Sequence, residues 1–132
     1  MDNSDRALTD TLGNYFQETD AQTRKQYPIV TGCLDYFPEA LLAVAECSRV
    51  GNEQHHPGTA LHWDKRKSTD EADALVRHLL ARGTRDTDGI RHTAKVAWRA
   101  LALLQREIEA EAQLNQAEEM TTEFLQQFLQ SS

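Results

Sequence analysis

IRHTAKVAWRALALLQREI, residues 90–108, is the stretch that decides the fold. Its apolar side chains return at alternating steps of four and three, the seam of an antiparallel or coiled-coil-like helical bundle. Those seam positions are Ile90, Ala94, Ala97, Leu101, Leu104 and Ile108. Val96, Ala100 and Leu103 make a second apolar side, which neighbouring helices or a second subunit must cover. We predict an all-α helical bundle that forms a homo-oligomer, a dimer or a tetramer.

A first helix is expected ahead of this stretch, from Phe37-Pro38 to about Val50. Proline is tolerated in the first turn of a helix, and Gly51-Asn52 supply a stop signal. Residues 52–67 have no sustained period and are predicted to form a loop. A loop of that length in a small domain is often functional.

A second helix carries signals at both of its boundaries. Ser68 and Glu71 form a capping box, in which each side chain accepts from a backbone N–H at the helix start. Gly83 supplies the stop, and Asp88 in the next loop can cap the third helix.

The C-terminal segment carries one apolar stripe, which predicts a second amphipathic helix that docks on the bundle or on a partner chain. The stripe consists of Ala117, Met120, Phe124, Leu125, Phe128 and Leu129. A chain of 132 residues fits one domain with a core of its own. We divide it into a polar segment that can form a short helix (1–26), a central helical domain (27–112) and the C-terminal amphipathic helix (113–132).

The charge balance limits the partners. Fourteen Lys and Arg face 21 Asp and Glu, a net charge of -7, which argues against a protein that holds polymeric nucleic acid. A compact nucleotide can still bind if carboxylates hold a metal ion that attracts its phosphates. The sequence shows no secretory signal and no membrane-spanning run, so we expect a cytoplasmic protein with reduced cysteines.

Four carboxylates occupy positions suited to Mg²⁺ or Mn²⁺. Glu39 and Glu46 are seven residues apart on one face of the first helix, and Asp70 and Asp73 are three apart at the start of the second. For the glutamates, the alternative is a solvated acidic stripe. For the aspartates, it is that Asp70 serves the helix dipole and Asp73 pairs with Arg77.

Basic and aromatic residues lie close to those carboxylates in the sequence. Lys65 and Lys67 immediately precede the second helix, where free amides can also bind an anion. Arg77 would add charge, and Trp63 would stack on a base or anchor its loop. His78 and His92 lie at the edges of apolar helix faces, where a histidine either packs structurally or touches a substrate. No histidine here has zinc-site spacing.

Several runs together resemble the phage-associated dATP/dGTP diphosphohydrolase family. The most telling pieces are FPEAL, KSTDEADALVRHL and DTDGIRHTAKVAW, whose order and spacing are hard to obtain by chance. The resemblance implies a MazG-like all-helical enzyme. Such an enzyme cleaves a purine deoxynucleoside triphosphate, dGTP or dATP, to the monophosphate and pyrophosphate with Mg²⁺ or Mn²⁺.

The chain departs from the MazG pattern, since it contains no Glu-x-x-Glu. The MazG-type site places carboxylates of two facing helices around metal. That arrangement makes Glu39, Glu46, Asp70 and Asp73 the best substitutes as catalytic metal ligands. Lys65, Lys67, Arg77, His78, His92 and Trp63 are then the expected substrate-binding residues.

Two other function classes stay open. In the first, the chain is a non-enzymatic helical module that binds another protein through its acidic surface and C-terminal stripe. In the second, it is a regulatory protein that binds a nucleotide without hydrolysing it. Dependence on a divalent metal separates an enzyme from the protein-binding module.

Overall fold

The computed structural model describes residues 20–67 and 69–131, which form helices and loops and contain no strand. The fold is therefore all-α, as predicted. The chain divides into two compact units, residues 1–41 and 42–132, which we describe separately. Among the described residues, none of the helices has the length and apolar character that crossing a membrane requires.

The described part of the first unit consists of short turns of helix. Helix α2 (Ala21–Arg24) begins at Asp20, whose Oδ1 accepts from the backbone N–H of Thr23 at 2.8 Å. A single π-helical turn, η2 (Val30–Leu34), follows. Of the predicted polar segment 1–26, residues 1–19 lie outside the described residues.

Helix α3 (Pro38–His55) begins where the sequence predicts and ends five residues later than predicted. Gly51-Asn52 do not stop it, because a glycine inside a helix costs only about 1 kcal/mol relative to alanine. The chain turns instead at Gly58, whose φ of 78° is a conformation that glycine adopts without strain. The loop after α3 is correspondingly shorter, and the Asn52 side chain braces it by donating to the carbonyl of Thr59 at 3.2 Å.

Helix α4 (Glu71–Leu80) begins three residues after Ser68, and its N-cap position is Asp70. The predicted capping box is therefore wrong in register, since Glu71 is itself the first helical residue and is buried. Ser68 lies outside the described residues. After the helix, Gly83 adopts a φ of 84°, in keeping with its predicted role as a stop signal.

Helix α5 (His92–Gln130) is one continuous helix of 39 residues, so the predicted C-terminal segment is helical but continues the third helix and does not form an element of its own. The stretch between the two predicted helices holds neither Gly nor Pro and is rich in Ala, Glu, Gln and Leu, which favour helix. Asp88 does not cap this helix, because its Oδ1 accepts from the backbone N–H of Ile90 and the N-cap position is Arg91.

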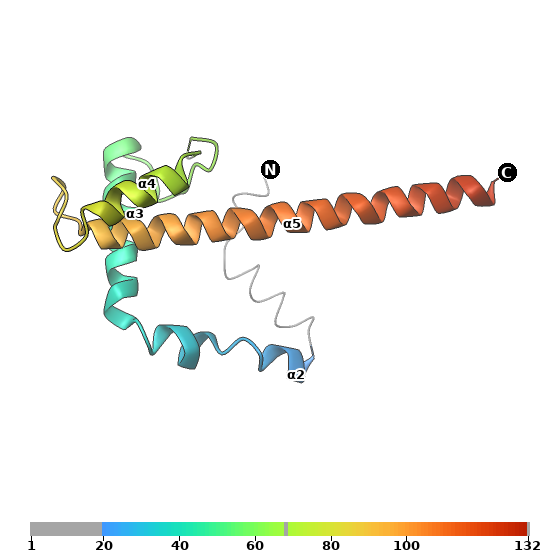
Figure 1. Ribbon diagram of the computed structural model, residues 1–132, viewed down its shortest axis with the longest axis horizontal. Helices are drawn as coiled ribbons and strands as arrows, with labels where there is room; N and C mark the ends of the chain where they lie inside the picture. The colour runs from blue at the N-terminus through green and yellow to red at the C-terminus, as the bar shows by residue number, and fades with distance from the viewer. Residues whose placement is uncertain (1–19, 68, 132) are drawn as a thin grey trace. The chain divides into compact units, whose positions relative to one another are not determined.

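Helix α4 packs along the N-terminal part of α5 (Figure 1). The side chains buried there are mostly small, which lets the two helices approach closely. The buried apolar residues are Ala74, Ile90, Ala94 and Ala102. The core of this unit is therefore thin and lies between α4 and the first turns of α5.

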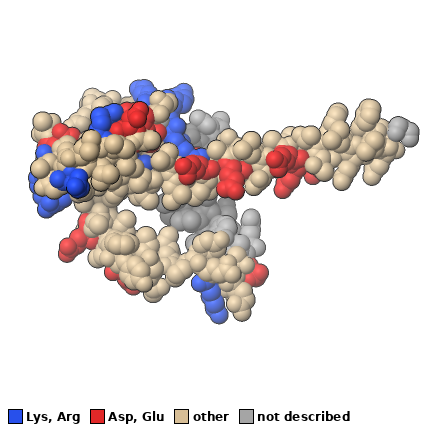
Figure 2. All heavy atoms as spheres, viewed as in Figure 1, with Lys and Arg blue, Asp and Glu red and all other residues tan. Residues whose placement is uncertain are grey.

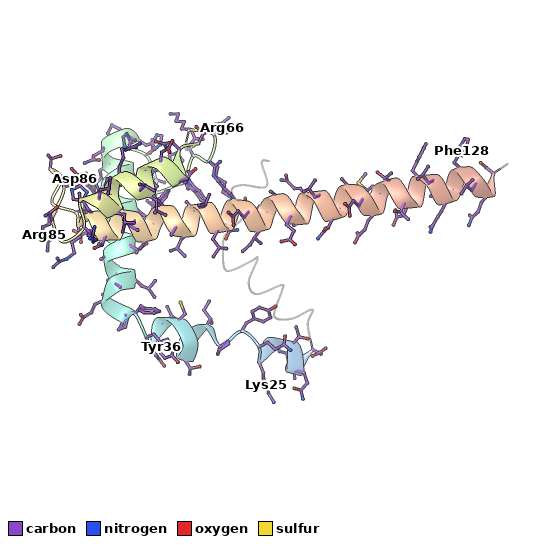
Figure 3. The ribbon with its side chains drawn as sticks, viewed as in Figure 1. Lys25, Tyr36, Arg66, Arg85, Asp86 and Phe128 are labelled. Atoms are coloured by element: carbon purple, nitrogen blue, oxygen red, sulfur yellow. The ribbon has the colours of Figure 1, made fainter. Side chains whose placement is uncertain are left out.

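The second half of α5 exposes its apolar stripe to solvent, including Phe124 and Phe128 near its end (Figure 3). No Lys or Arg follows Arg106, and this part of the helix shows only acidic and uncharged side chains in Figure 2. An exposed stripe of this size fits the predicted homo-oligomer, which stays a prediction.

Candidate functional site

A pocket of about 1020 Å³ opens within the second unit. Helix α3, the loop that follows it, α4 and the first half of α5 line its walls. The volume lies at the upper end of the range for small-molecule sites and suits a ligand as large as a nucleotide. Its lining residues include an ionic group around Lys95 and an aromatic group around Trp63 and Trp98.

Lys95 forms the centre of the ionic group. Its Nζ lies 2.7 Å from Asp86 Oδ2 and 2.8 Å from Asp88 Oδ2, so one ammonium bridges two carboxylates. The hydrogen bond from Lys95 and that from the Thr87 N–H lower the pKa of Asp86 to about 2. Burial opposes ionisation of Asp88, but bonds from Lys95 and from the Ile90 N–H outweigh it and lower its pKa. Both carboxylates are charged at neutral pH.

The loop between α4 and α5 holds these carboxylates in place. The Asp86 N–H donates to the carbonyl of Ile90 at 2.8 Å, and Ile90 anchors the loop by burying its side chain. Gly89 has a φ of 81°, which permits the tight return of the chain. Figure 3 shows Asp86 in this loop, beside the start of α5.

Two histidines meet next to this loop. The Nδ1 atoms of His78 on α4 and His92 on α5 lie 2.9 Å apart. One ligand atom from each of them and one from Asp86 all lie within 4.8 Å of one another. Burial, and then the nearby positive charge of Lys95, lower the pKa of His78, so its ring is neutral at pH 7 and has a lone pair to offer.

The aromatic group couples α3, the following loop and α5. The rings of Trp63 and Trp98 pack edge to face with centroids 5.6 Å apart, and Trp98 Nε1 donates to Ser48 Oγ at 2.7 Å. Two buried polar atoms of pocket-lining residues, Asn52 Oδ1 and Trp63 Nε1, have no hydrogen-bond partner among the described residues. A buried group of this kind is normally satisfied by water or a ligand.

A buried carboxylate lies between α4 and α5. Glu71 is 4% exposed, and its Oε1 lies 4.0 Å from Arg99 Nη1 and 3.8 Å from Arg106 Nε. Arg106 also donates to the backbone carbonyl of Lys65, which ties the loop to α5. This network positions Arg99, which lines the pocket.

Five of the predicted site residues contribute to this region. Trp63, Lys67, Asp70 and His78 line the pocket, and His92 contacts His78 beside it. Asp70 lies 3.7 Å from Arg99 Nη1 and 3.3 Å from Arg77 Nη2, so the predicted pairing of Arg77 with Asp73 is replaced by one with Asp70.

The other predicted residues are not among those that line the pocket. Glu39 is exposed and belongs to the first unit. Glu46 and Asp73 are exposed on α3 and α4, and Glu46 lies 3.9 Å from Arg49. Lys65 Nζ forms an ion pair with Glu109 at 2.6 Å.

Sequence reasoning gave no site role to Asp86, Asp88, Lys95 or Trp98. A signal was available, because the sequence DTDG followed by a lysine seven residues after Asp88 puts a cation on the first turn of a helix behind an acidic loop. Nothing in that spacing shows that both carboxylates turn back onto the lysine.

Fold and pocket together define an all-α protein with a ligand-sized cavity lined by carboxylates, imidazoles, cations and indoles. The family model of the dATP/dGTP diphosphohydrolase N-terminal domain matches residues 17–116, most of the chain, and the chain belongs to that family. No curated protein and no solved structure matches it.

Proposed function

We propose that this chain hydrolyses a purine deoxynucleoside triphosphate, dGTP or dATP, to the monophosphate and pyrophosphate with the help of a divalent metal ion. One observation carries the proposal: every residue that lines the pocket falls within the segment matched by the diphosphohydrolase family. The family name supplies the reaction class, and the pocket supplies a place of the right size and chemistry.

The ionic group of the pocket favours a triphosphate once a metal is bound. Asp86, Asp88 and Lys95 together carry a net charge of -1 at neutral pH, since both aspartate pKa values are lowered and that of Lys95 is raised. A divalent ion would turn this into a net positive charge and polarise a phosphoryl oxygen. Arg99 and Lys67 also line the pocket and would neutralise further phosphate charge.

The aromatic group supports binding of the base. An indole edge or face contacts a purine favourably, and Trp63 and Trp98 already form one wall. Asn52 offers a buried acceptor and Trp63 a buried donor without partners among the described residues. A purine edge carries both kinds of complementary group, and pairing them would recover the cost of burying these atoms.

The four carboxylates predicted as metal ligands stay a prediction, with unequal support. Asp70 lines the pocket, whereas Glu46, Asp73 and Glu39 do not. Glu46→Gln and Asp73→Asn test the set directly. Loss of hydrolysis in both, with unchanged helix content, would keep these residues as ligands, and full activity would remove them.

The experiment is a product analysis. Purified protein is incubated with each of the common NTPs and dNTPs plus Mg²⁺ or Mn²⁺, and products are separated by ion-exchange chromatography. We expect dGMP or dAMP with equimolar pyrophosphate, at least a hundredfold less in Asp88→Asn, and wild-type amounts in Glu118→Gln, a matched change far along α5. Release of a nucleoside diphosphate and orthophosphate, or no turnover of any nucleotide, would contradict the proposal.

A non-enzymatic role in binding another protein is favoured by a different observation, the exposed apolar stripe on the second half of α5. Binding of dGTP without any turnover would support the third class, a regulatory nucleotide-binding protein. The same product analysis, combined with a measurement of dGTP affinity, separates these alternatives from the enzyme.

A further inference from the structure

The close pair formed by His78 and His92 calls for a chemical explanation. Their Nδ1 atoms lie 2.9 Å apart and their ring centroids 5.2 Å apart, so the two nitrogens face each other within hydrogen-bond distance. With their protons on Nε2, both rings offer an Nδ1 lone pair to an ion. The Asp86 carboxylate is the third group whose ligand atom lies within 4.8 Å of the other two.

The donor set indicates which ions fit. Imidazole nitrogen suits first-row transition metals, whereas Mg²⁺ takes oxygen ligands and keeps most of its water. Two imidazoles and one carboxylate therefore favour Mn²⁺, Fe²⁺ or Co²⁺ over Mg²⁺. The all-carboxylate set predicted from the sequence has the opposite preference.

The charges around the three residues favour binding of a cation. Asp88 lies beside Asp86 through their shared partner Lys95, so two negative charges are present for one ammonium. Asp86 has four lone-pair positions, and those it uses for Lys95 and Thr87 leave it able to ligate. His78 also lines the pocket, which connects an ion held there to the space proposed for the substrate.

We propose that His78, Asp86 and His92 form a metal site that binds one first-row transition ion, such as Mn²⁺, in preference to Mg²⁺. The catalytic use of this ion rests on the proposed hydrolase function, whereas the binding of the ion does not. Binding itself can be measured without any nucleotide.

The test uses Mn²⁺ alone on the full chain. Electron paramagnetic resonance of free Mn²⁺ counts bound ions, and we expect one tight site per chain that a hundredfold excess of Mg²⁺ does not empty. Removing a residue that only hydrogen-bonds to a metal ligand typically lowers metal affinity by about 10–100-fold. His78→Ala, His92→Ala and Asp86→Asn each remove a ligand itself and should therefore lower the Mn²⁺ affinity by more.

His62→Gln is the matched control, because His62 and His56 form another close imidazole pair, with ring centroids 4.5 Å apart. It should leave the Mn²⁺ affinity unchanged. Circular dichroism shows whether each variant keeps its helices. Co²⁺ gives a second readout, since its visible absorption changes when imidazole nitrogens replace water as ligands.

The outcomes separate this inference from the proposed function. Mn²⁺ bound through the two histidines, with no nucleotide turnover, would sustain the metal site and remove the hydrolase. Turnover supported by Mg²⁺, with Mn²⁺ affinity unaffected in all three ligand variants, would sustain the hydrolase and overturn the metal site. Easy displacement of Mn²⁺ by Mg²⁺ would overturn the stated preference.

Discussion

Lys95→Met removes the ammonium that bridges Asp86 and Asp88 while keeping a side chain of similar length. Lys95 is mostly buried and contacts both carboxylates at hydrogen-bond distance. The variant leaves two aspartates facing each other without a cation. We expect the folded protein to lose stability at neutral pH through the electrostatics of this loop, with little change in packing.

The magnitude follows from the pKa of Asp86, which is about 2 in the folded protein against 3.8 for the free side chain. That difference corresponds to at most about 2.4 kcal/mol, at 1.36 kcal/mol for each pH unit. Asp86 is 28% exposed and salt screens part of the attraction, so we expect a loss of about 1 kcal/mol.

The pH dependence has a definite sign. Because the folded pKa of Asp86 is depressed, its contribution is fully present above the unfolded value near 4 and is lost as the pH falls toward 2. The wild type loses this contribution in acid, and the variant lacks the part of it that Lys95 supplies. The difference in unfolding free energy should therefore hold from pH 7 to 5, fall by about half near pH 3 and vanish below pH 2.

Urea unfolding followed by circular dichroism at pH 7, 5 and 3 measures this difference. Lys67→Met is the control, because Lys67 is 70% exposed and its Nζ lies 4.0 Å from Asp64. It should change stability little at any pH. A Lys95→Met penalty that is equally large at pH 3 and pH 7 would refute the reasoning and assign the loss to packing of the lysine stem.

Three other predictions concern the frame around the pocket. Glu71→Gln should lower the unfolding free energy in urea by about 2 kcal/mol, less than for fully buried pairs because the arginines retain contact with water. Ser48→Ala should lower the free energy of unfolding by about 1–2 kcal/mol, because it leaves Trp98 Nε1 without its acceptor. In a Trp98→Phe background the same substitution should cost much less. Phe128→Glu should lower the molar mass measured by light scattering if the exposed stripe on α5 joins subunits.

The helices were predictable where periodicity and breakers agree. Spacing of apolar residues identified α4 and the first half of α5, and the proline placed the start of α3. Two of the boundary errors come from weak local signals. Gly51 costs too little to end a helix by itself, and no breaker separates Ile108 from Ala117, so one helix replaced two.

The pocket was only partly predictable, because its ionic group is assembled by long-range folding. Lys67 and Asp70 were identified as site residues from their places near a helix start, Trp63 from its place in the loop beside the cations, and His78 from its place at the edge of an apolar helix face. Asp88 was considered only as a helix cap, and Asp86 was given no role. Carboxylates in a short loop acquire one only when the next helix presents a lysine to them, and that geometry depends on the turn at Gly89 and on burial of Ile90.

The histidine pair shows why residue spacing alone was a poor guide to metal chemistry here. His78 and His92 are fourteen residues apart in the sequence and match no metal-ligand motif. Helix α4 ends soon after His78, the loop reverses the chain, and α5 starts at His92 against α4, which brings the two rings together. A helix–turn–helix that packs antiparallel thus creates a ligand pair across the turn, while the loop between supplies the carboxylate. Without a Glu-x-x-Glu, this arrangement gives the chain a different way to hold a metal beside the same pocket.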